Sequence, residues 1–401
     1  MKSSFASFKL RPGFIRFYQA AALVVFNALV FFVVANLILF IADPLWHKVT
    51  GRSKFAIVRK YGVDLLQQSY PGLRRDEMLQ LFEETWNHTL VYEPFTLFRD
   101  GAYRGRFVNV DARGFRAIKN QSAWPPSPTN FNIFVFGGST TFGYGVADAE
   151  TIPSFLQEKL PADVGGRRVR VFNFGRASYY STQERILFEQ LLASGQRPNL
   201  AIFIDGLNEF LYADDAPRFS EQLEQLFNGG LRDYRPLGIL GELPVIQKLE
   251  KLQRSVSRLA AGARRSGKPV PTQSEEQLKV LANRACEHYL NNLRLVEAVA
   301  ERFQVKAAFV WQPVPAYKYD LAYHPFREPA VGNHACSAIG YPLMALRVAT
   351  HPPAVNFLWG ADLQENRHEP LYVDAVHYSP KMCELLATEI ALRIDERQLL
   401  K

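Results

Sequence analysis

The sequence predicts an α/β protein, a mostly parallel β-sheet with helices on both faces, preceded by one N-terminal transmembrane helix. Two observations support this prediction. Short apolar runs alternate with helical spacing through the C-terminal part of the chain, as parallel strands alternate with crossover helices. Near the N-terminus, the run from Ala20 to Ala42 contains no charged side chain.

The apolar run is long enough for a bilayer. Its 23 residues would form a helix of roughly 34 Å, and a bilayer core is about 30 Å thick. A cleaved signal peptide has a shorter apolar region, so we predict an uncleaved signal-anchor over residues 20–42. Lys and Arg flank it almost equally, so the positive-inside rule does not fix its orientation. Our hypothesis places residues 1–19 in the cytoplasm and the body in the periplasm or outside the cell.

Composition narrows the class of protein. The chain has 401 residues, 48% apolar and 21% charged, which excludes general disorder and a many-span membrane protein. Its net charge of +8 is dispersed and no nucleic-acid-binding motif accompanies it, so the charge indicates a solvated face or contact with lipid headgroups, and no nucleic acid partner is expected. The three cysteines form no close pair, so a structural zinc site is not expected. We expect no cofactor. A disulfide between Cys286 and Cys336 stays open.

The chain is predicted to continue beyond the anchor in two parts. Residues 43–130 mix short helical patterns with turns, as a stalk or cap would. Residues 131–401 form the α/β domain, with a helical insertion at about 211–275 that is typical of a lid or docking surface, or else of simple surface decoration. Ser181 and Glu184 have the spacing of a capping box, which predicts a helix start. Strands are expected at 131–136, 168–174, 200–204 and 305–310, and a helix at 152–160.

Glycines and small polar residues follow the first three strands. Ser139 comes after the first strand, Gly175 after the second and Asn208 after the third. Functional groups of an open parallel sheet collect beyond the carboxyl ends of its strands. A serine at a strand-to-helix turn can expose both its hydroxyl and its amide, so Ser139 is the predicted nucleophile. A phosphate-binding loop is the competing interpretation, but no Lys-Ser/Thr pair closes the glycine run.

A hydroxyl nucleophile needs a base, and Asp374-Ala-Val-His377 supplies one before a last helix predicted to start at Ser379-Pro380. Groups three residues apart can lie on one side of a turn, so Asp374 can hold the imidazole tautomer while His377 takes the serine proton. The predicted oxyanion hole contains three donors, each worth about 3 to 4 kcal/mol when well placed. They are the Ser139 N–H, the Gly175 N–H and the Asn208 side-chain amide.

Taken in order, these blocks resemble the SGNH (GDSL-type) hydrolase superfamily, in a membrane-anchored member. The four blocks are Gly137-Gly-Ser139 with Gly143, Asn173-Phe-Gly175, Gly206-Leu-Asn208-Glu209 and Asp374-x-x-His377. The resemblance covers roughly residue 131 to the end. It departs from the family at Gly-Gly-Ser in place of Gly-Asp-Ser and at Asn-Glu in place of Asn-Asp. It implies a flavodoxin-like three-layer fold and ester chemistry on acyl groups.

The leading hypothesis is therefore a membrane-anchored serine esterase or O-acyltransferase that works through an acyl-serine intermediate, with water or a sugar hydroxyl as acceptor. By analogy with anchored members of the superfamily, the acyl ester belongs to a cell-envelope polysaccharide. The alternative is a non-catalytic protein that keeps the fold to bind a polysaccharide or a membrane acyltransferase partner.

Overall fold

The computed structural model describes residues 12–50, 56–86, 88–221, 223–224, 243–246, 248, 274–326, 335–351 and 353–401. The chain divides into two compact units. One contains Met1–Lys54 and Gly229–Thr272, and the other contains Phe55–Asn228 and Gln273–Lys401. Most of the predicted insertion at 211–275 lies outside the described residues.

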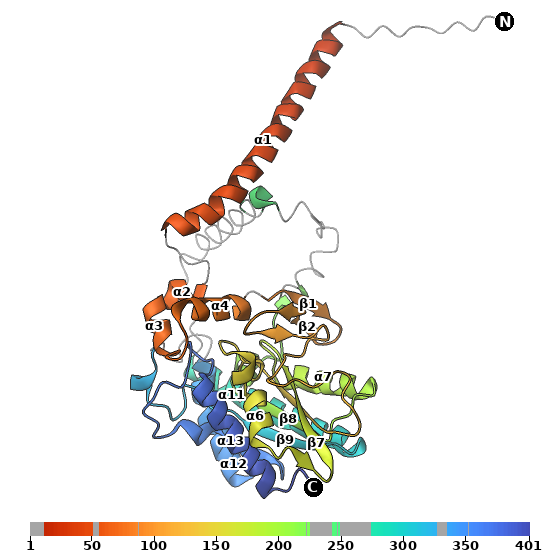
Figure 1. The fold of residues 1–401 in the computed structure, drawn as a ribbon, viewed down its shortest axis with the longest axis vertical. Helices are drawn as coiled ribbons and strands as arrows, with labels where there is room; N and C mark the ends of the chain where they lie inside the picture. The colour runs from red at the N-terminus through yellow and green to blue at the C-terminus, as the bar shows by residue number, and fades with distance from the viewer. Residues whose placement is uncertain are drawn as a thin grey trace, which may run out of the picture. The chain divides into compact units, whose positions relative to one another are not determined.

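The smaller unit contains the long helix α1 (Pro12–Thr50) (Figure 1). Within it, the 27 residues from Arg16 to Ala42 are long and apolar enough to cross a membrane, and they include the predicted span. The polar side chain of Asn36 finds partners here. Its amide donates to Phe32 O at 2.8 Å, and its Oδ1 accepts from Val245 N at 3.0 Å. Both polar ends of this side chain are therefore satisfied within an apolar helix.

The larger unit is built on a six-stranded sheet with the order β10-β9-β8-β5-β7-β6. The strands β10, β9, β8, β5 and β7 run parallel, and only β6 is antiparallel to its neighbour. The order reverses between β5 and β8, so their carboxyl ends border the crevice where doubly wound sheets bind ligands. The bounds are β5 Phe131–Gly137, β6 Asp163–Val164, β7 Arg167–Gly175, β8 Leu200–Asp205, β9 Lys306–Trp311 and β10 Phe357–Trp359.

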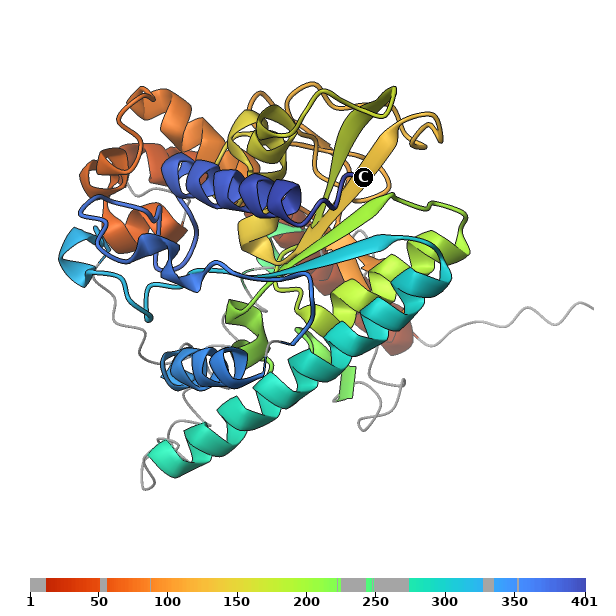
Figure 2. The same cartoon turned by 90° about the horizontal axis from the view of Figure 1, so that it is seen from below.

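Helices cover both faces of this sheet, which confirms the predicted fold class (Figure 2). Alternate side chains of β5 point to opposite faces, Ile133 and Val135 toward α6 and α13, and Phe134 and Phe136 toward α7, α11 and α12. Both faces are apolar because each is buried, as expected for a parallel sheet. The helices are α5 Ser139–Phe142, α6 Ile152–Lys159, α7 Ser181–Ala193, α8 Leu207–Leu211, α11 Glu275–Arg302, α12 Ala335–Thr350 and α13 Pro380–Glu396, with 3-10 turns at Asp148–Glu150, Leu321–Tyr323 and Ala361–Gln364.

Stacked phenylalanine rings fix the register of four strands on one face. Phe136 of β5 lies between Phe174 of β7, with ring centroids 5.6 Å apart, and Phe203 of β8, at 4.8 Å. Phe203 in turn stacks on Phe309 of β9 at 5.6 Å. Cross-strand aromatic pairs of this kind stabilise a sheet beyond the area they bury. The four predicted strands match β5, β7, β8 and β9 to within a residue at each end.

The described residues between 56 and 130 form a cap that belongs to the larger unit. Its apolar core joins side chains of the cap, among them Leu66, Met78 and Phe82, to Val373, which precedes Asp374 in the chain. The cap therefore packs against the loop that carries two of the predicted catalytic residues. Its elements are α2 Ala56–Tyr61, α3 Val63–Gln68, α4 Arg75–Trp86, the antiparallel pair β1 Leu90–Glu93 and β2 Leu97–Asp100, and the pair β3 Tyr103–Arg104 and β4 Asn109–Val110.

Candidate active site

Ser139 begins α5 directly after β5, at the carboxyl edge of the sheet. Two glycines make this turn possible. A Cβ on Gly137 would lie 2.1 Å from Thr141 Oγ1, and a Cβ on Gly138 would lie 2.5 Å from Asn208 Nδ2. Both contacts are shorter than real side chains allow, so only glycine lets the turn pack this tightly. The hydroxyl of Ser139 is left half-buried at the end of the strand.

His377 and Asp374 lie opposite this serine, in a loop closed by a bridge between Tyr372 and Tyr378. His377 Nε2 is 2.9 Å from Ser139 Oγ, and His377 Nδ1 is 2.6 Å from Asp374 Oδ2. Oδ1 of Asp374 accepts from the N–H groups of Val376 at 2.9 Å and of His377 at 2.8 Å. The structure thus brings the three residues into a continuous hydrogen-bonded chain.

The charge of Asp374 is favoured by these contacts. Burial by itself raises the pKa of its carboxyl, but the charge and hydrogen bond of His377 and the N–H groups of His377 and Val376 outweigh burial and lower the pKa to about 2. The carboxylate is therefore ionised at neutral pH. An ionised carboxylate at Nδ1 keeps the ring proton there and leaves Nε2 able to accept the serine proton.

Two of the three predicted oxyanion donors lie beside the serine. The Ser139 N–H opens α5, where a helix has no internal partner for it. Nδ2 of Asn208 donates one hydrogen to Tyr179 O at 2.6 Å, which leaves its second hydrogen for a ligand. The prediction for Gly175 is wrong. Its N–H donates to Asn173 Oδ1 at 2.9 Å and cannot serve an oxyanion at the same time.

Ser178 is the residue that the sequence analysis missed. It has a left-handed backbone, with φ of 62°, and it is half-buried. In the described part of the chain, its N–H makes no hydrogen bond. The next residue, Tyr179, holds the Asn208 amide through its carbonyl, so the Ser178 turn lies beside the other two donors. A turn of small residues, Ala177-Ser178, at a strand end was the available signal, and the preceding glycine obscured it.

Gln312 lies next to the segments that carry Ser139 and His377. It follows β9 and is buried, and its Oε1 accepts from Thr140 Oγ1 at 2.7 Å. The hydroxyl of Tyr378 donates to the carbonyl oxygen of the next residue, Pro313, at 2.5 Å and lies 3.2 Å from Gln312 Oε1. Thr140 follows Ser139 and Tyr378 follows His377 in the chain, so the segment after β9 contacts the segments of both residues.

Behind Asn208, a buried carboxylate holds the start of α7. Glu209 accepts from Ser181 N at 2.8 Å and from Ser181 Oγ at 2.7 Å. The predicted capping box is therefore wrong, because the hydroxyl of Ser181 is engaged by Glu209 and Glu184 points into the interior. Burial, together with Asp205 and Glu209, raises the pKa of Glu184 well above its ordinary value. Burial also raises the pKa of Asp205, to about 7.

Cys286 and Cys336 are free, buried thiols in the structure. Burial is the main cause that raises the pKa of Cys286 to about 12 and the pKa of Cys336 to about 11. Across the described ranges, no three His, Cys, Asp or Glu side chains are grouped as metal ligands.

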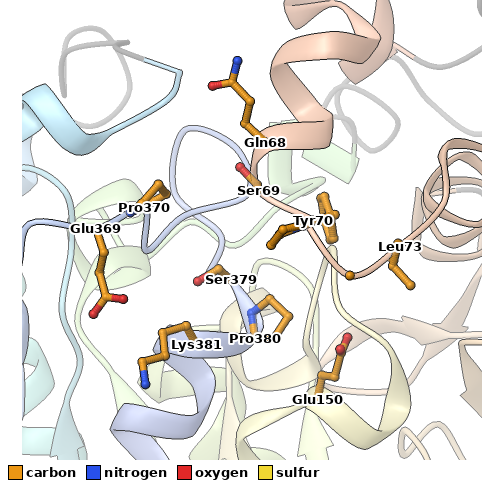
Figure 3. A pocket seen from close by; sticks show the side chains of 12 residues that line it. Gln68, Ser69, Tyr70, Leu73, Glu150, Glu369, Pro370, Ser379, Pro380 and Lys381 are labelled. Atoms are coloured by element: carbon orange, nitrogen blue, oxygen red, sulfur yellow. The ribbon is translucent and has the colours of Figure 1, made fainter.

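A cavity of about 450 Å³ lies between the cap and the segments on either side of the loop from Tyr372 to Tyr378 (Figure 3). Two hydrogen bonds join the cap to the site here. Ser69 Oγ donates to Tyr372 O at 3.3 Å, and Tyr70 OH donates to Gly145 O at 2.5 Å. Further lining residues come from the turn before α6 and from the start of α13, among them Glu150 and Lys381.

Among known proteins, only solved structures are similar to this chain. The chain resembles GDSL-type hydrolases. A lipolytic protein of the G-D-S-L family from Veillonella parvula is 10% identical, with TM-score 0.33 over 66% of this chain and 96% of that one. A GDSL-like lipase from Bacteroides thetaiotaomicron is 13% identical, with TM-score 0.33 over 68% and 91%. A variant of an acetyl-xylooligosaccharide esterase from Geobacillus Stearmophilus is 12% identical, with TM-score 0.37 over 66% and 94%.

No protein-family model matches the chain, and no curated protein matches it. At such low identity and TM-score, the likeness says nothing of the reaction. The chemistry rests on the residues of the site itself.

Proposed function

We propose that this protein is a serine esterase that cleaves acyl esters through an acyl-Ser139 intermediate. The observation that carries the proposal is the chain of contacts at 2.9 Å and 2.6 Å from Ser139 Oγ through His377 to Asp374. A nucleophile within hydrogen-bond distance of a base, itself oriented by a carboxylate, is the arrangement that activates a serine.

The reaction has two halves. Ser139 Oγ bonds to the ester carbonyl carbon while its proton passes to His377 Nε2. The tetrahedral intermediate then breaks its bond to the alcohol oxygen, which takes that proton from His377 and leaves. A water molecule next gives a proton to His377 and attacks the acyl carbon, and Ser139 departs with its proton restored.

The negative oxygen of each intermediate needs donors placed in advance. We propose the N–H groups of Ser139 and Ser178 and the second hydrogen of the Asn208 amide. Their positions at adjacent strand ends support this assignment, and each well-placed donor is worth about 3 to 4 kcal/mol. The tie from Asn208 to Tyr179 O keeps the side chain and the Ser178 turn in one arrangement.

Active-site labelling tests the nucleophile. Full-length protein in detergent should react with a fluorophosphonate at Ser139, and Ser139→Ala and His377→Ala should each abolish labelling and ester turnover while the protein stays folded. Ser194→Ala and His351→Ala, which change exposed residues remote from the triad in sequence, are the matched controls. Retained turnover in either triad variant would overturn the assignment. Failure to label the wild type would favour the non-catalytic polysaccharide-binding alternative.

We further propose that the helix from Arg16 to Ala42 anchors the enzyme in a membrane, with its body outside the cytoplasm and acyl esters of a polysaccharide as substrates. The length and apolar composition of the helix support the anchor. Protease added to intact spheroplasts should digest the body. A body that survives such treatment would place it in the cytoplasm instead.

The acyl acceptor separates hydrolysis from transfer. If a sugar hydroxyl replaces water in the second half of the reaction, an acylated sugar forms in place of the free acid. Product analysis with and without an added oligosaccharide acceptor distinguishes the two. Free acid alone, at every acceptor concentration, would exclude the O-acyltransferase reaction for that acceptor.

A further inference from the structure

Two aromatic side chains contact the imidazole of His377. Tyr144, just beyond α5, stacks on the imidazole with ring centroids 5.4 Å apart and planes inclined by 23°. Trp86, the last residue of α4 in the cap, meets the same ring at 82° with centroids 6.3 Å apart. The two aromatic rings also pack on each other, at 5.8 Å and 83°. The imidazole therefore has aromatic neighbours from two segments distant in sequence.

We propose that Tyr144 and Trp86 are positioning residues that hold the imidazole of His377 toward Ser139, and that the ring face of Tyr144 stabilises the imidazolium formed during the reaction, so that the cap completes the active site. This inference rests on the proposed function, because His377 becomes protonated when it takes the proton of Ser139. Neither residue belongs to the triad or to the oxyanion donors.

The physical reason lies in the charge distribution of an aromatic ring. Its face is negative, and a cation within about 6 Å of the centroid is attracted to it. The imidazolium that forms when Ser139 attacks lies at this distance from Tyr144, whereas the neutral imidazole gains much less. The interaction is therefore stronger in the transition state, and its loss should slow the reaction roughly 5- to 30-fold.

The charged groups near Tyr144 and His377 are consistent with stabilisation of the imidazolium by the tyrosine ring. Asp374 is the charged group that contacts the imidazole directly, through Nδ1. Burial, with the charge of Asp100, raises the pKa of Tyr144, while Arg218 and Arg116 oppose that shift. The phenol therefore stays neutral, and its ring face keeps the ordinary negative potential.

The cap fixes the position of Trp86. Phe82 packs on Trp86 and Tyr70 packs on Phe82, each with centroids 5.4 Å apart. At Gly145, an added Cβ would lie 2.6 Å from Val373 Cγ2, 3.0 Å from Tyr70 OH and 3.3 Å from Trp86. Cap and catalytic loop thus meet at a glycine with no spare room, and a displaced cap would release the imidazole.

The experiment compares rates of fluorophosphonate labelling of full-length protein across the pH range in which histidine titrates. Tyr144→Leu should label roughly 5- to 30-fold more slowly at its optimum, because the imidazolium has lost the ring face that stabilises it. Tyr144→Phe keeps the ring face and should recover most of the rate. Trp86→Leu should also slow labelling. Tyr92→Leu, which changes an aromatic residue that is 75% exposed, is the control.

An unchanged labelling rate in Tyr144→Leu would overturn the inference, as would an equal loss of rate in Tyr144→Phe, which would assign the effect to the hydroxyl. If Tyr144→Leu does not fold, phenylalanines with increasing fluorine content at position 144 keep the shape and weaken the ring face. Labelling must then slow in order of fluorine content, and equal rates would overturn the inference. A wild type that is not labelled, or labelling that survives Ser139→Ala, would instead overturn the proposed function.

Discussion

Replacing Asp374 by asparagine tests the triad with almost no change of shape. In the native site, Oδ1 accepts two backbone N–H groups and Oδ2 faces His377 Nδ1 at 2.6 Å. The amide oxygen of asparagine can keep the two backbone bonds, which leaves its NH₂ group against Nδ1. Two donors cannot face each other, so the imidazole must carry its proton on Nε2. That nitrogen then cannot accept the proton of Ser139.

Asp374→Asn should lower kcat strongly and the free energy of unfolding only modestly. The wrong tautomer costs about 10⁴ in kcat in triads of this kind, or roughly 5.5 kcal/mol of transition-state stabilisation. The pKa of Asp374 is about 2 in the folded protein, against about 3.9 in an unfolded chain, so its charge contributes about 2 to 3 kcal/mol to the free energy of unfolding at neutral pH. Asp374→Asn should lose at most that amount.

The assay is hydrolysis of 4-nitrophenyl acetate by full-length protein in detergent, with the thermal midpoint measured on the same samples. Asp395→Asn, at an exposed position of α13, is the control for the change of charge. An Asp374→Asn protein that is folded and retains wild-type kcat would refute the reasoning, because the tautomer would then be set by another group.

Four further results are expected. The free energy of unfolding should fall as pH drops from about 4 to about 2, where the depressed carboxyl of Asp374 is protonated, and circular dichroism of Asp374→Asn should not show this loss. Glu184 has a raised pKa, so its contribution to the free energy of unfolding is lost as pH rises above about 4.5, and denaturant titrations of Glu184→Gln should show a weaker decline over that rise. Ser178→Gly should gain about 1 kcal/mol in the same titrations by relieving a left-handed serine, with kcat nearly retained because the N–H remains. Asn208→Ala should lower kcat by about 10² to 10³.

For each of these four predictions, one result would contradict the reasoning. Acid loss of equal size in wild type and Asp374→Asn would place the titrating group elsewhere. A Glu184→Gln variant with the wild-type pH profile would mean that this carboxyl is not the one that titrates. Loss of kcat in Ser178→Gly would assign a function to the Ser178 hydroxyl, and full kcat in Asn208→Ala would remove that amide from the oxyanion hole.

The strands and the contact between Asp374 and His377 were predictable because their signals are local. Each core strand is a short apolar run that ends at a glycine or a polar residue, and a parallel sheet brings such ends to one edge. The spacing of Asp374 and His377 in the turn before α13 likewise determines their contact. The helix start at Ser379-Pro380 was also predicted correctly, and Ser379 Oγ accepts from Met382 N as an N-cap.

The errors arose where a residue's partner is distant in sequence. Gly175 has the expected residue type and position, but the side chain of Asn173 takes its N–H. Ser181 and Glu184 have the spacing of a capping box. In the structure, however, the side chain of Glu184 is buried, and the hydroxyl of Ser181 donates to Glu209. The ring contacts of Trp86 and the contacts of Gln312 depend on how the cap and β9 pack. A local sequence pattern therefore cannot predict these contacts.

The neighbouring strands β8 and β9 are joined by the longest connection in the sheet, from Asp205 to Lys306. The entropic cost of closing a flexible loop grows slowly, by only about 0.6 kcal/mol for each doubling of its length. The residues that align these two strands, Phe203 and Phe309, lie inside the sheet and not in the connection. A change in the length of this connection should therefore leave the parallel pairing of β8 and β9, and with it the relative position of the residues that follow these two strands, unchanged.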